Sequence, residues 1–267
     1  MRLVYILLSL ITFSQAFSQN YFEGKNLYCK SENVEALKKF NEGIEILNLN
    51  HNLDTKYLAI NTTIFFDAVK MDKSFCDAYF FVGYTLRLQN KLDLALRYYY
   101  IADSLSQNKS IEFKQNLAVT ALMLGKDKLS RKKYSEIIKY FPESPEGYYG
   151  VALTSPIIGD VEKGLENINL TFEKYKNSGQ KINDDVLFLN GVLLTLNKKY
   201  EESIVYFEKT YSTYKKDENY NIHYSLSLLK VSEIKKDEKM KNKAKKIYDK
   251  IEHKEEIPKE LKELLIF

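Results

Sequence analysis

The stretch that decides the fold runs from Asp77 to Leu86 (DAYFFVGYTL) and continues, after the polar turn 89–91, from Ala95 to Ala102 (ALRYYYIA). Apolar residues recur at helical spacing on both sides of the turn. Gly83 and Ala95 are small enough to let two helices cross closely, and Tyr99 is placed to fill the gap beside the crossing. The stretch therefore predicts two antiparallel amphipathic helices joined by a tight turn.

The same pattern recurs three more times toward the C-terminus. Its turns are centred on Asn90, Gly125, Gly159 and Lys198, which are 35, 34 and 39 residues apart. The longer last step follows from a polar insertion at 176–181. One helix pair cannot bury its own apolar face, so neighbouring pairs must stack. We therefore expect four repeats, which span 76–110, 111–144, 145–183 and 184–217.

These repeats resemble the tetratricopeptide repeat (TPR) family, whose pattern Trp-x2-Leu-Gly-x2-Tyr, Ala-x3-Phe, Pro they approximate. The unit from Tyr79 to Ala102 follows the pattern best. The closing proline occurs only as Pro142, and Tyr, Leu or a polar residue such as Lys114 replaces the Trp. The resemblance implies an all-α fold, a right-handed α-solenoid of stacked antiparallel helix pairs.

Weaker helix pairs flank the four repeats. Segment 19–75 contains an atypical first pair, with helices expected over about 36–47 and 54–71. Segment 218–267 contains a degenerate last pair and a short helix after Pro258, which we expect to cap the end of the solenoid. The whole chain is then about five to six helix pairs plus a C-terminal capping helix.

Residues 1–18 have the features of a secretory signal peptide. Arg2 precedes the apolar run from Leu3 to Phe13, and small residues suit cleavage after either Ala16 or Ser18. The run has about 11 residues against the roughly 20 that a membrane span requires. No cysteine at the cleavage site offers a lipid anchor. We expect an exported chain, periplasmic or secreted, without a membrane span.

The composition excludes several classes of protein. The chain has 267 residues, 45% of them hydrophobic, which is typical of a packed core and not of a disordered chain. A net charge of only +4 gives no reason to expect a nucleic-acid partner. Cys29 and Cys76 are too few for a zinc module. After export they can form a disulfide that ties the N-terminal segment to the helical body; the alternative is two buried thiols.

The sequence contains no persuasive catalytic, metal or cofactor motif. A P-loop, a dinucleotide-binding glycine run, His-Glu-x-x-His and Cys-x-x-Cys are all missing. His51, His223 and His253 lie far apart and have no ligand partners at helical spacing. Two Ser-x-x-Lys matches lack the companion motifs of Ser-Lys enzymes. We expect a non-catalytic protein with no metal and no cofactor; an enzyme built from scattered residues is a minor alternative.

The TPR resemblance implies that the first helix of each repeat lines a concave groove. Its apolar and aromatic character suits an extended peptide or an amphipathic helix. The alternative for each side chain is a place in the core. The carboxylate clamp of chaperone-binding members looks absent, because Arg87 is the only cation on this face of the best repeat. The predicted groove residues are Phe80, Tyr84, Arg87, Gln115, Val119, Leu122, Tyr149, Leu153, Phe188 and Val192.

A basic stretch, Lys235–Lys254, holds nine Lys against four acidic residues. It is compatible with contact to an anionic surface, but the intermixed acids favour the solvated face of a helix.

Together these features predict a non-catalytic protein–protein interaction module, a scaffold that binds another protein through a peptide or helix segment in the groove. The alternative is a structural subunit of a bacterial envelope or secretion assembly with permanent repeat-mediated interfaces.

Overall fold

The computed structural model describes residues 19–22, 24–49 and 54–267, which form two compact units, 19–142 and 143–267. The predicted signal peptide, 1–18, lies outside the described residues. Within the described part of the chain, no helix combines the length and the apolar character needed to cross a bilayer.

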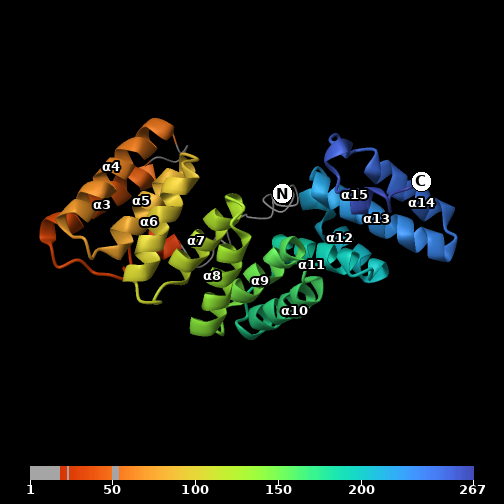
Figure 1. The fold of residues 1–267 in the computed structure, drawn as a ribbon, viewed down its shortest axis with the longest axis horizontal. Helices are drawn as coiled ribbons and strands as arrows, with labels where there is room; N and C mark the ends of the chain where they lie inside the picture. Colours follow the sequence, from red (N-terminus) through yellow and green to blue (C-terminus); the bar gives the residue numbers. More distant parts are fainter. Residues whose placement is uncertain (1–18, 23, 50–53) are drawn as a thin grey trace. The chain divides into compact units, whose positions relative to one another are not determined.

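Unit 19–142 is a stack of three helix pairs (Figure 1). The two helices of each pair pack on one another, and α4 and α6 also pack against the first helix of the next pair. The short helix α2 (Gln19–Phe22) precedes the stack. The pairs are α3 (Val34–Leu49) with α4 (Thr55–Met71), α5 (Cys76–Leu88) with α6 (Leu92–Leu105), and α7 (Ile111–Met123) with α8 (Asp127–Tyr140).

Unit 143–267 repeats this arrangement with three pairs of its own. They are α9 (Pro145–Ile158) with α10 (Val161–Asn177), α11 (Asp184–Leu196) with α12 (Tyr200–Tyr214), and α13 (Glu218–Lys235) with α14 (Glu238–Tyr248). A 3₁₀ turn, η1 (Lys254–Glu256), and the short helix α15 (Lys259–Lys262) follow. The six pairs and the terminal α15 confirm the predicted all-α solenoid of stacked helix pairs.

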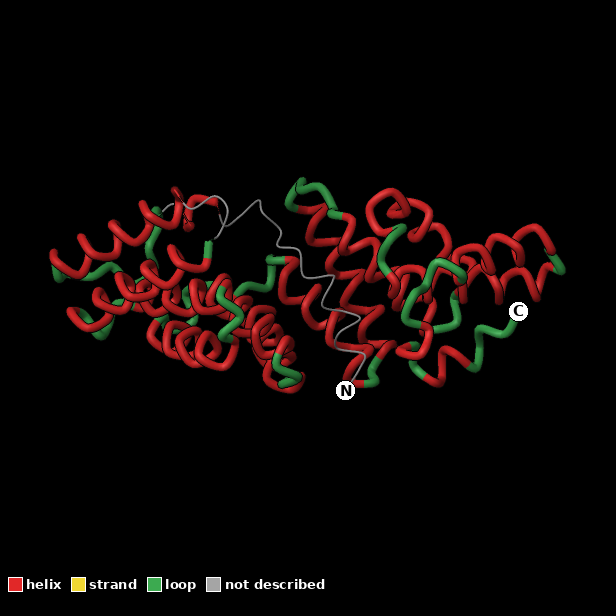
Figure 2. The backbone as a smooth tube through the Cα atoms, turned by 90° about the horizontal axis from the view of Figure 1, so that it is seen from above, coloured by secondary structure: helices red, strands yellow, loops and turns green. Residues whose placement is uncertain are grey.

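Each pair in the four central repeats turns at a residue of left-handed conformation. The φ angles are +58° at Asn90, +67° at Gly125, +88° at Gly159 and +60° at Lys198, so the four predicted turn positions are confirmed. A left-handed residue just after a helix lets the following N–H reach back to the last turn. After α11, for example, Lys199 N donates to Leu194 O at 2.8 Å. Figure 2 shows the resulting short connections between helices.

The helices within a pair cross closely where the sequence offers a glycine. A Cβ atom at Gly83 of α5 would lie 2.9 Å from the Tyr99 ring and 3.2 Å from Ala95 O of α6. At Gly191 of α11 it would lie 3.1 Å from the Phe207 ring of α12. At Gly83 a side chain would require its neighbours to shift, and at Gly191 it would be tighter than most packing contacts, so the predicted close helix crossings are confirmed at both positions.

Candidate peptide-binding face

The first helix of the middle pair in unit 19–142, α5, is buried on nearly all sides. Its inner faces pack against α4 and α6. Its remaining face is covered by residues 19–22 and 24–33, called the strap below, which consist of α2 and a stretch of turns and bends that leads into α3. A short helix and an irregular segment therefore lie where a solenoid of this type would otherwise expose its first helices.

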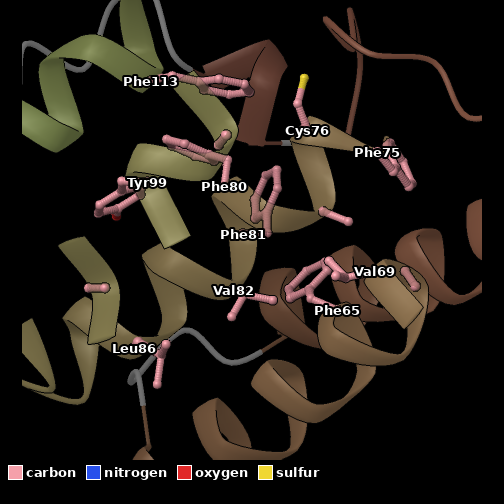
Figure 3. Close-up of a cluster of buried hydrophobic side chains, with 14 of the residues drawn as sticks. Phe65, Val69, Phe75, Cys76, Phe80, Phe81, Val82, Leu86, Tyr99 and Phe113 are labelled. Carbon is pink, nitrogen blue, oxygen red and sulfur yellow. The ribbon is translucent and has the colours of Figure 1, made fainter. Parts of the chain in front are cut away.

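The strap binds an aromatic face, made of Phe80, Phe81 and Tyr84 of α5 and Phe113 of α7. Tyr21 places its ring 5.4 Å from Phe80 and 5.5 Å from Phe81, and Phe22 lies 4.9 Å from Tyr84, all between ring centroids. Phe80 stacks on Phe113 at 4.8 Å. Figure 3 shows Phe80 and Phe81 on α5, with Phe113 on the neighbouring helix. Such ring pairs add to the stabilisation from buried apolar area.

Asp77, the second residue of α5, binds the backbone of the strap. Its carboxylate accepts hydrogen bonds from Tyr28 N at 3.1 Å and Cys29 N at 2.7 Å, and from the Tyr21 hydroxyl at 2.8 Å. Burial raises the pKa of the Asp77 carboxyl, and these hydrogen bonds offset part of the rise. Burial and then the Asp77 charge raise the pKa of the Tyr21 hydroxyl well above its ordinary value, so it remains a donor.

Further contacts fix the C-terminal half of the strap. Cys29 and Cys76 form a disulfide with their Cα atoms 5.4 Å apart. The Tyr28 hydroxyl donates to Glu112 of α7 at 2.5 Å, and the Ser31 hydroxyl donates to the Asp72 carboxylate. Carboxylates thus hold the strap at Tyr28 and at Ser31, and the disulfide holds it at Cys29, between these two residues.

The structure corrects half of the predicted groove residues in unit 19–142. Phe80 is 0% exposed because it is enclosed by the strap, Phe113 and Tyr99. Val119 and Leu122 are buried within the packing of α7. Val119 and Leu122 are thus core residues, and the strap of the same chain covers Phe80, so the prediction that these three side chains line an open groove is wrong.

The other three predicted residues of this unit, Tyr84, Arg87 and Gln115, are half-buried. The Arg87 guanidinium lies 5.5 Å from the centre of the Tyr84 ring, and its Nε donates to the Tyr99 hydroxyl at 3.4 Å. Arg87 and Tyr84 therefore lie side by side at the edge of the strap site.

In unit 143–267 the same prediction is wrong for Leu153, Phe188 and Val192, which are at most 1% exposed. Phe188 packs between its own pair and the next one: its ring centroid lies 4.7 Å from that of Tyr214 and 5.5 Å from that of Tyr220. It is a core residue between repeats. Tyr149 of α9 is half-buried and, of the four residues predicted here, is the one that keeps a solvent-exposed surface.

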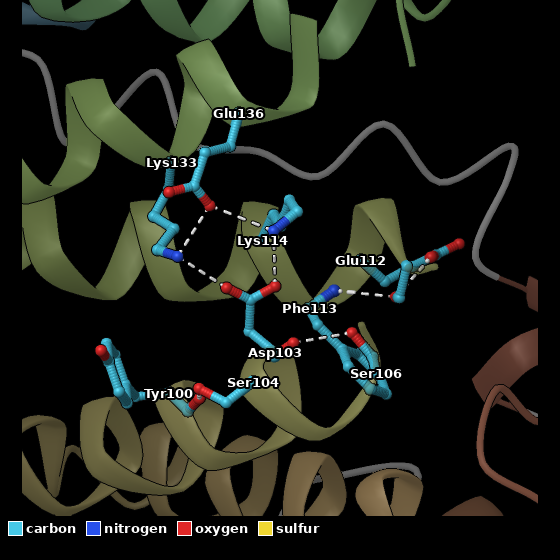
Figure 4. A network of polar contacts seen from close by, with 10 residues as sticks. Tyr100, Asp103, Ser104, Ser106, Glu112, Phe113, Lys114, Lys133 and Glu136 are labelled. Carbon is cyan, nitrogen blue, oxygen red and sulfur yellow. Dashed lines mark hydrogen bonds and ion pairs between the residues drawn. The ribbon is translucent and has the colours of Figure 1, made fainter. Parts of the chain in front are cut away.

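A buried charge network that the sequence pattern did not indicate links α6, α7 and α8 (Figure 4). Asp103 Oδ1 lies 2.8 Å from Lys114 Nζ, and Oδ2 lies 2.7 Å from Lys133 Nζ. Glu136 contacts both ammonium groups, at 3.1 and 2.8 Å. Burial by itself would raise the pKa of Glu136, but the hydrogen bonds from Lys133 and Lys114 outweigh it and hold the pKa below its usual value. Lys114 thus stands at the position of the family's Trp as a buried charge that is paired with two carboxylates.

The C-terminal segment is captured in a similar manner to the strap. Glu218, the first residue of α13, accepts hydrogen bonds from Glu252 N at 2.8 Å and His253 N at 3.2 Å. The same carboxylate lies 3.1 Å from His253 Nδ1 and raises the pKa of this exposed imidazole. An acidic residue at the start of a first helix again binds two successive backbone N–H groups.

Several lysines of the basic stretch Lys235–Lys254 contact the preceding helix α12. Lys235 pairs with Glu201, Lys243 lies 3.0 Å from Glu208, and Lys250 donates to the Tyr211 hydroxyl at 3.0 Å. These contacts join the last helix pair to its neighbour, as expected for the outer face of a packed helix.

Comparison with known proteins identifies the fold. No protein-family model matches the sequence, and no curated protein shows significant sequence similarity to it. Among solved structures, a chain of the APC/C hetero-tetramer Cut9–Hcn1 aligns with 86% of this chain at 16% identity and a TM-score of 0.60. This chain spans about two-fifths of that protein's length, 42%.

Two smaller structures align over most of their own length. PilF of Pseudomonas aeruginosa matches over 80% of this chain and 90% of its own, with 13% identity and a TM-score of 0.57. YrrB, a TPR protein with an unusual peptide-binding site, matches over 74% of this chain and 95% of its own, with 15% identity and a TM-score of 0.52. At these identities the likeness establishes the fold, which is that of TPR proteins.

Proposed function

We propose that this chain, which has the TPR fold, is a non-catalytic protein–protein interaction module that binds an extended peptide or an amphipathic helix along the first helices of its repeats. The observation that carries the proposal is the strap. The aromatic face and Asp77 hold a short helical turn and an irregular segment of the chain through rings and backbone N–H groups, so this surface has the chemistry of a peptide site.

We further propose that the chain acts after export, in the periplasm or outside the cell. The pattern of residues 1–18 and the Cys29–Cys76 disulfide support this location, because disulfides persist in oxidising compartments. N-terminal sequencing of the mature protein from cell fractions tests the proposal. A mature chain that begins at Phe17 or Gln19 agrees with it, whereas an intact Met1 in the cytoplasmic fraction contradicts it.

The interaction proposal is tested by crosslinking the tagged chain in native envelope extracts and identifying the captured proteins by mass spectrometry. The matched variants are Tyr149→Ala, on a first helix, and Val205→Ala, on the second helix α12, where Val205 is 50% exposed. A peptide-binding module should lose its partner about tenfold or more with Tyr149→Ala, since truncating an interface hot spot costs about 2 kcal/mol. Val205→Ala should leave recovery unchanged.

The same experiment separates the alternative function. A structural subunit of an envelope assembly would retain several stoichiometric partners through both substitutions, because large permanent interfaces do not depend on one aromatic residue. That result would overturn the peptide-binding proposal.

A further inference from the structure

The face that holds the strap is a built site and not simply a layer of packed helices. Asp77 is 0% exposed, and the strap supplies it with two backbone N–H donors and one hydroxyl. A buried carboxylate that loses its donors is strongly destabilised. The site therefore requires an occupant that presents successive backbone N–H groups beside Asp77.

The strap also shows which side chains such an occupant carries. Tyr21 and Phe22 contact the aromatic face, and Tyr28, six residues after Phe22, lies 5.4 Å from Phe113 and donates its hydroxyl to Glu112. The matching ligand is a peptide that has an aromatic pair in a helical turn, about six residues before the N–H groups bound by the carboxylate. Recognition by backbone and rings in this way does not depend on any charge in the ligand.

One disulfide bond holds the strap on this site. Cys29 directly follows Tyr28, so the disulfide lies beside the pair of N–H groups that Asp77 accepts. Cys76 is 0% exposed, whereas Cys29 is half-buried. Cys29 is therefore the more exposed residue of the disulfide, and we assign the attack of an external thiolate to its sulfur.

We propose that the strap is an exchangeable ligand of its own chain: reduction of the disulfide by a dithiol releases it, and the opened face then binds a peptide of the same chemistry from another molecule. The inference rests on the proposed peptide-binding function and adds its regulation. In the disulfide form the site is closed, which is the resting state expected in an oxidising compartment.

The redox step is a thiol–disulfide exchange. A thiolate of the dithiol attacks the Cys29 sulfur, forms a mixed disulfide and expels the Cys76 thiolate, which takes up a proton. The second thiol of the reductant then attacks the mixed disulfide and releases Cys29, which ends as a thiol. Two electrons pass to the protein, and the reductant leaves as a disulfide. The Cys76 sulfur lies 3.7 Å from Asp77 Oδ2, so its new S–H is placed to donate to that carboxylate.

Hydrogen exchange on the full chain tests whether reduction of the disulfide releases the strap. After treatment with dithiothreitol, the amides of Tyr28 and Cys29 should exchange about tenfold faster or more, while amides in α11 keep their protection. A Cys29→Ser, Cys76→Ser double variant should show the fast exchange with or without dithiothreitol. Equal protection of the strap in the oxidised, reduced and double-variant proteins would overturn the proposal and make the strap a permanent part of the fold.

Binding in trans needs a second measurement, because the reduced strap stays attached through α3 and competes at an effective concentration of about millimolar. The protein for this test is the full chain with Tyr21→Ala and Phe22→Ala, checked for helix content by circular dichroism. The probe is a fluorescent synthetic peptide of residues 19–33 with Cys29→Ser. The reduced variant should bind it about tenfold tighter or more than the oxidised wild type does. Equal affinity of the two proteins for the peptide would overturn the proposed exchange of the strap.

The two proposals fail in distinguishable ways. An opened face that binds the 19–33 peptide, in a chain whose envelope partners are insensitive to Tyr149→Ala, would keep the inference and remove the proposed function. Partners that depend on Tyr149, together with a strap whose protection never changes, would keep the proposed function and remove the inference.

Discussion

Asp103 lies between two lysine ammonium groups in the interior of unit 19–142, and Lys114 is 1% exposed there. A buried ion pair adds little net stability, but removing Asp103 leaves a single carboxylate, that of Glu136, to balance two largely buried ammonium groups. We expect Asp103→Asn to lower the free energy of unfolding by about 3–5 kcal/mol.

Asp93→Asn is the matched control for this prediction. Asp93 also pairs with a lysine, Lys126, at 3.6 Å, but its side chain is 74% exposed. Exposed pairs contribute about 0–1 kcal/mol, so this variant should unfold close to wild type. Denaturant titration followed by circular dichroism measures both. Equal effects of the two substitutions would show that the Asp103 network is solvated.

His223 makes the stability of unit 143–267 dependent on pH. It is buried in α13, and burial lowers its pKa from 6.5 to about 4. Between these two values the unfolded chain binds a proton that the folded chain does not, so acidification favours unfolding. The contribution is complete above pH 6.5 and is lost as the pH falls toward 4, with a decrease of about 2 kcal/mol by pH 5.

His223→Phe should remove this dependence between pH 7 and pH 5, while the chain with His223 should retain it. The comparison isolates one histidine, because His253, whose pKa Glu218 raises, shifts stability in the opposite direction in both proteins. Urea titrations at several pH values give the slopes. Parallel slopes for the two proteins would mean that His223 is protonated in the folded chain.

Residue types alone could not separate core from binding face. Phe80 was predicted to line a groove from its position on α5, but its burial depends on Tyr21, which lies 59 positions earlier and packs on it. An aromatic residue at helical spacing has the same sequence pattern in either place. The occupant of a surface is a long-range contact, which repeat periodicity does not encode.

At the level of the helix, one feature of the site did have a sequence pattern that was missed. The second residue of four successive first helices is acidic: Asp77, Glu112, Glu146 and Asp185, which are 35, 34 and 39 residues apart. This spacing is the same as that of the turns. Carboxylates near a helix N-terminus are favoured by the helix dipole, so the pattern alone has a structural explanation. The carboxylates of Asp77, Glu112 and Asp185, however, each accept a tyrosine hydroxyl, from Tyr21, Tyr28 and Tyr214 respectively.

The turns between helices were predictable because their requirement is local. A left-handed residue suits glycine, and two of the four turns have it, while Lys198 adopts φ +60° at a cost of about 1 kcal/mol. We expect Lys198→Gly to raise the melting temperature modestly and Gly125→Lys to lower it by an amount that corresponds to about 1 kcal/mol. A side chain at Gly125 meets nothing within 4 Å, so only backbone strain is measured. A stabilising Gly125→Lys would contradict the assigned turn geometry.

At the scale of the molecule, each unit contains three helix pairs and secures a terminal segment with an acidic residue at the start of a first helix, Asp77 in one and Glu218 in the other. The units differ in how that segment is held. In unit 143–267 the capture of residues 252 and 253 rests on hydrogen bonds and an ion pair. In unit 19–142 the disulfide adds a covalent bond, so this unit alone has a stability that depends on redox state.

Closing the loop between Cys29 and Cys76, which are 47 residues apart, reduces the conformational entropy of the unfolded chain. For a loop of this length the chain-entropy relation gives about 4 kcal/mol. We expect reduction to lower the unfolding midpoint of unit 19–142 accordingly and to leave unit 143–267 unaffected. The Cys29→Ser, Cys76→Ser chain should unfold at this lower midpoint with or without reductant. Hydrogen exchange measured helix by helix distinguishes the two units. Slower exchange of the α7 amides after reduction, or an equal loss of amide protection in α11, would show that the disulfide does not act through the loop that it closes.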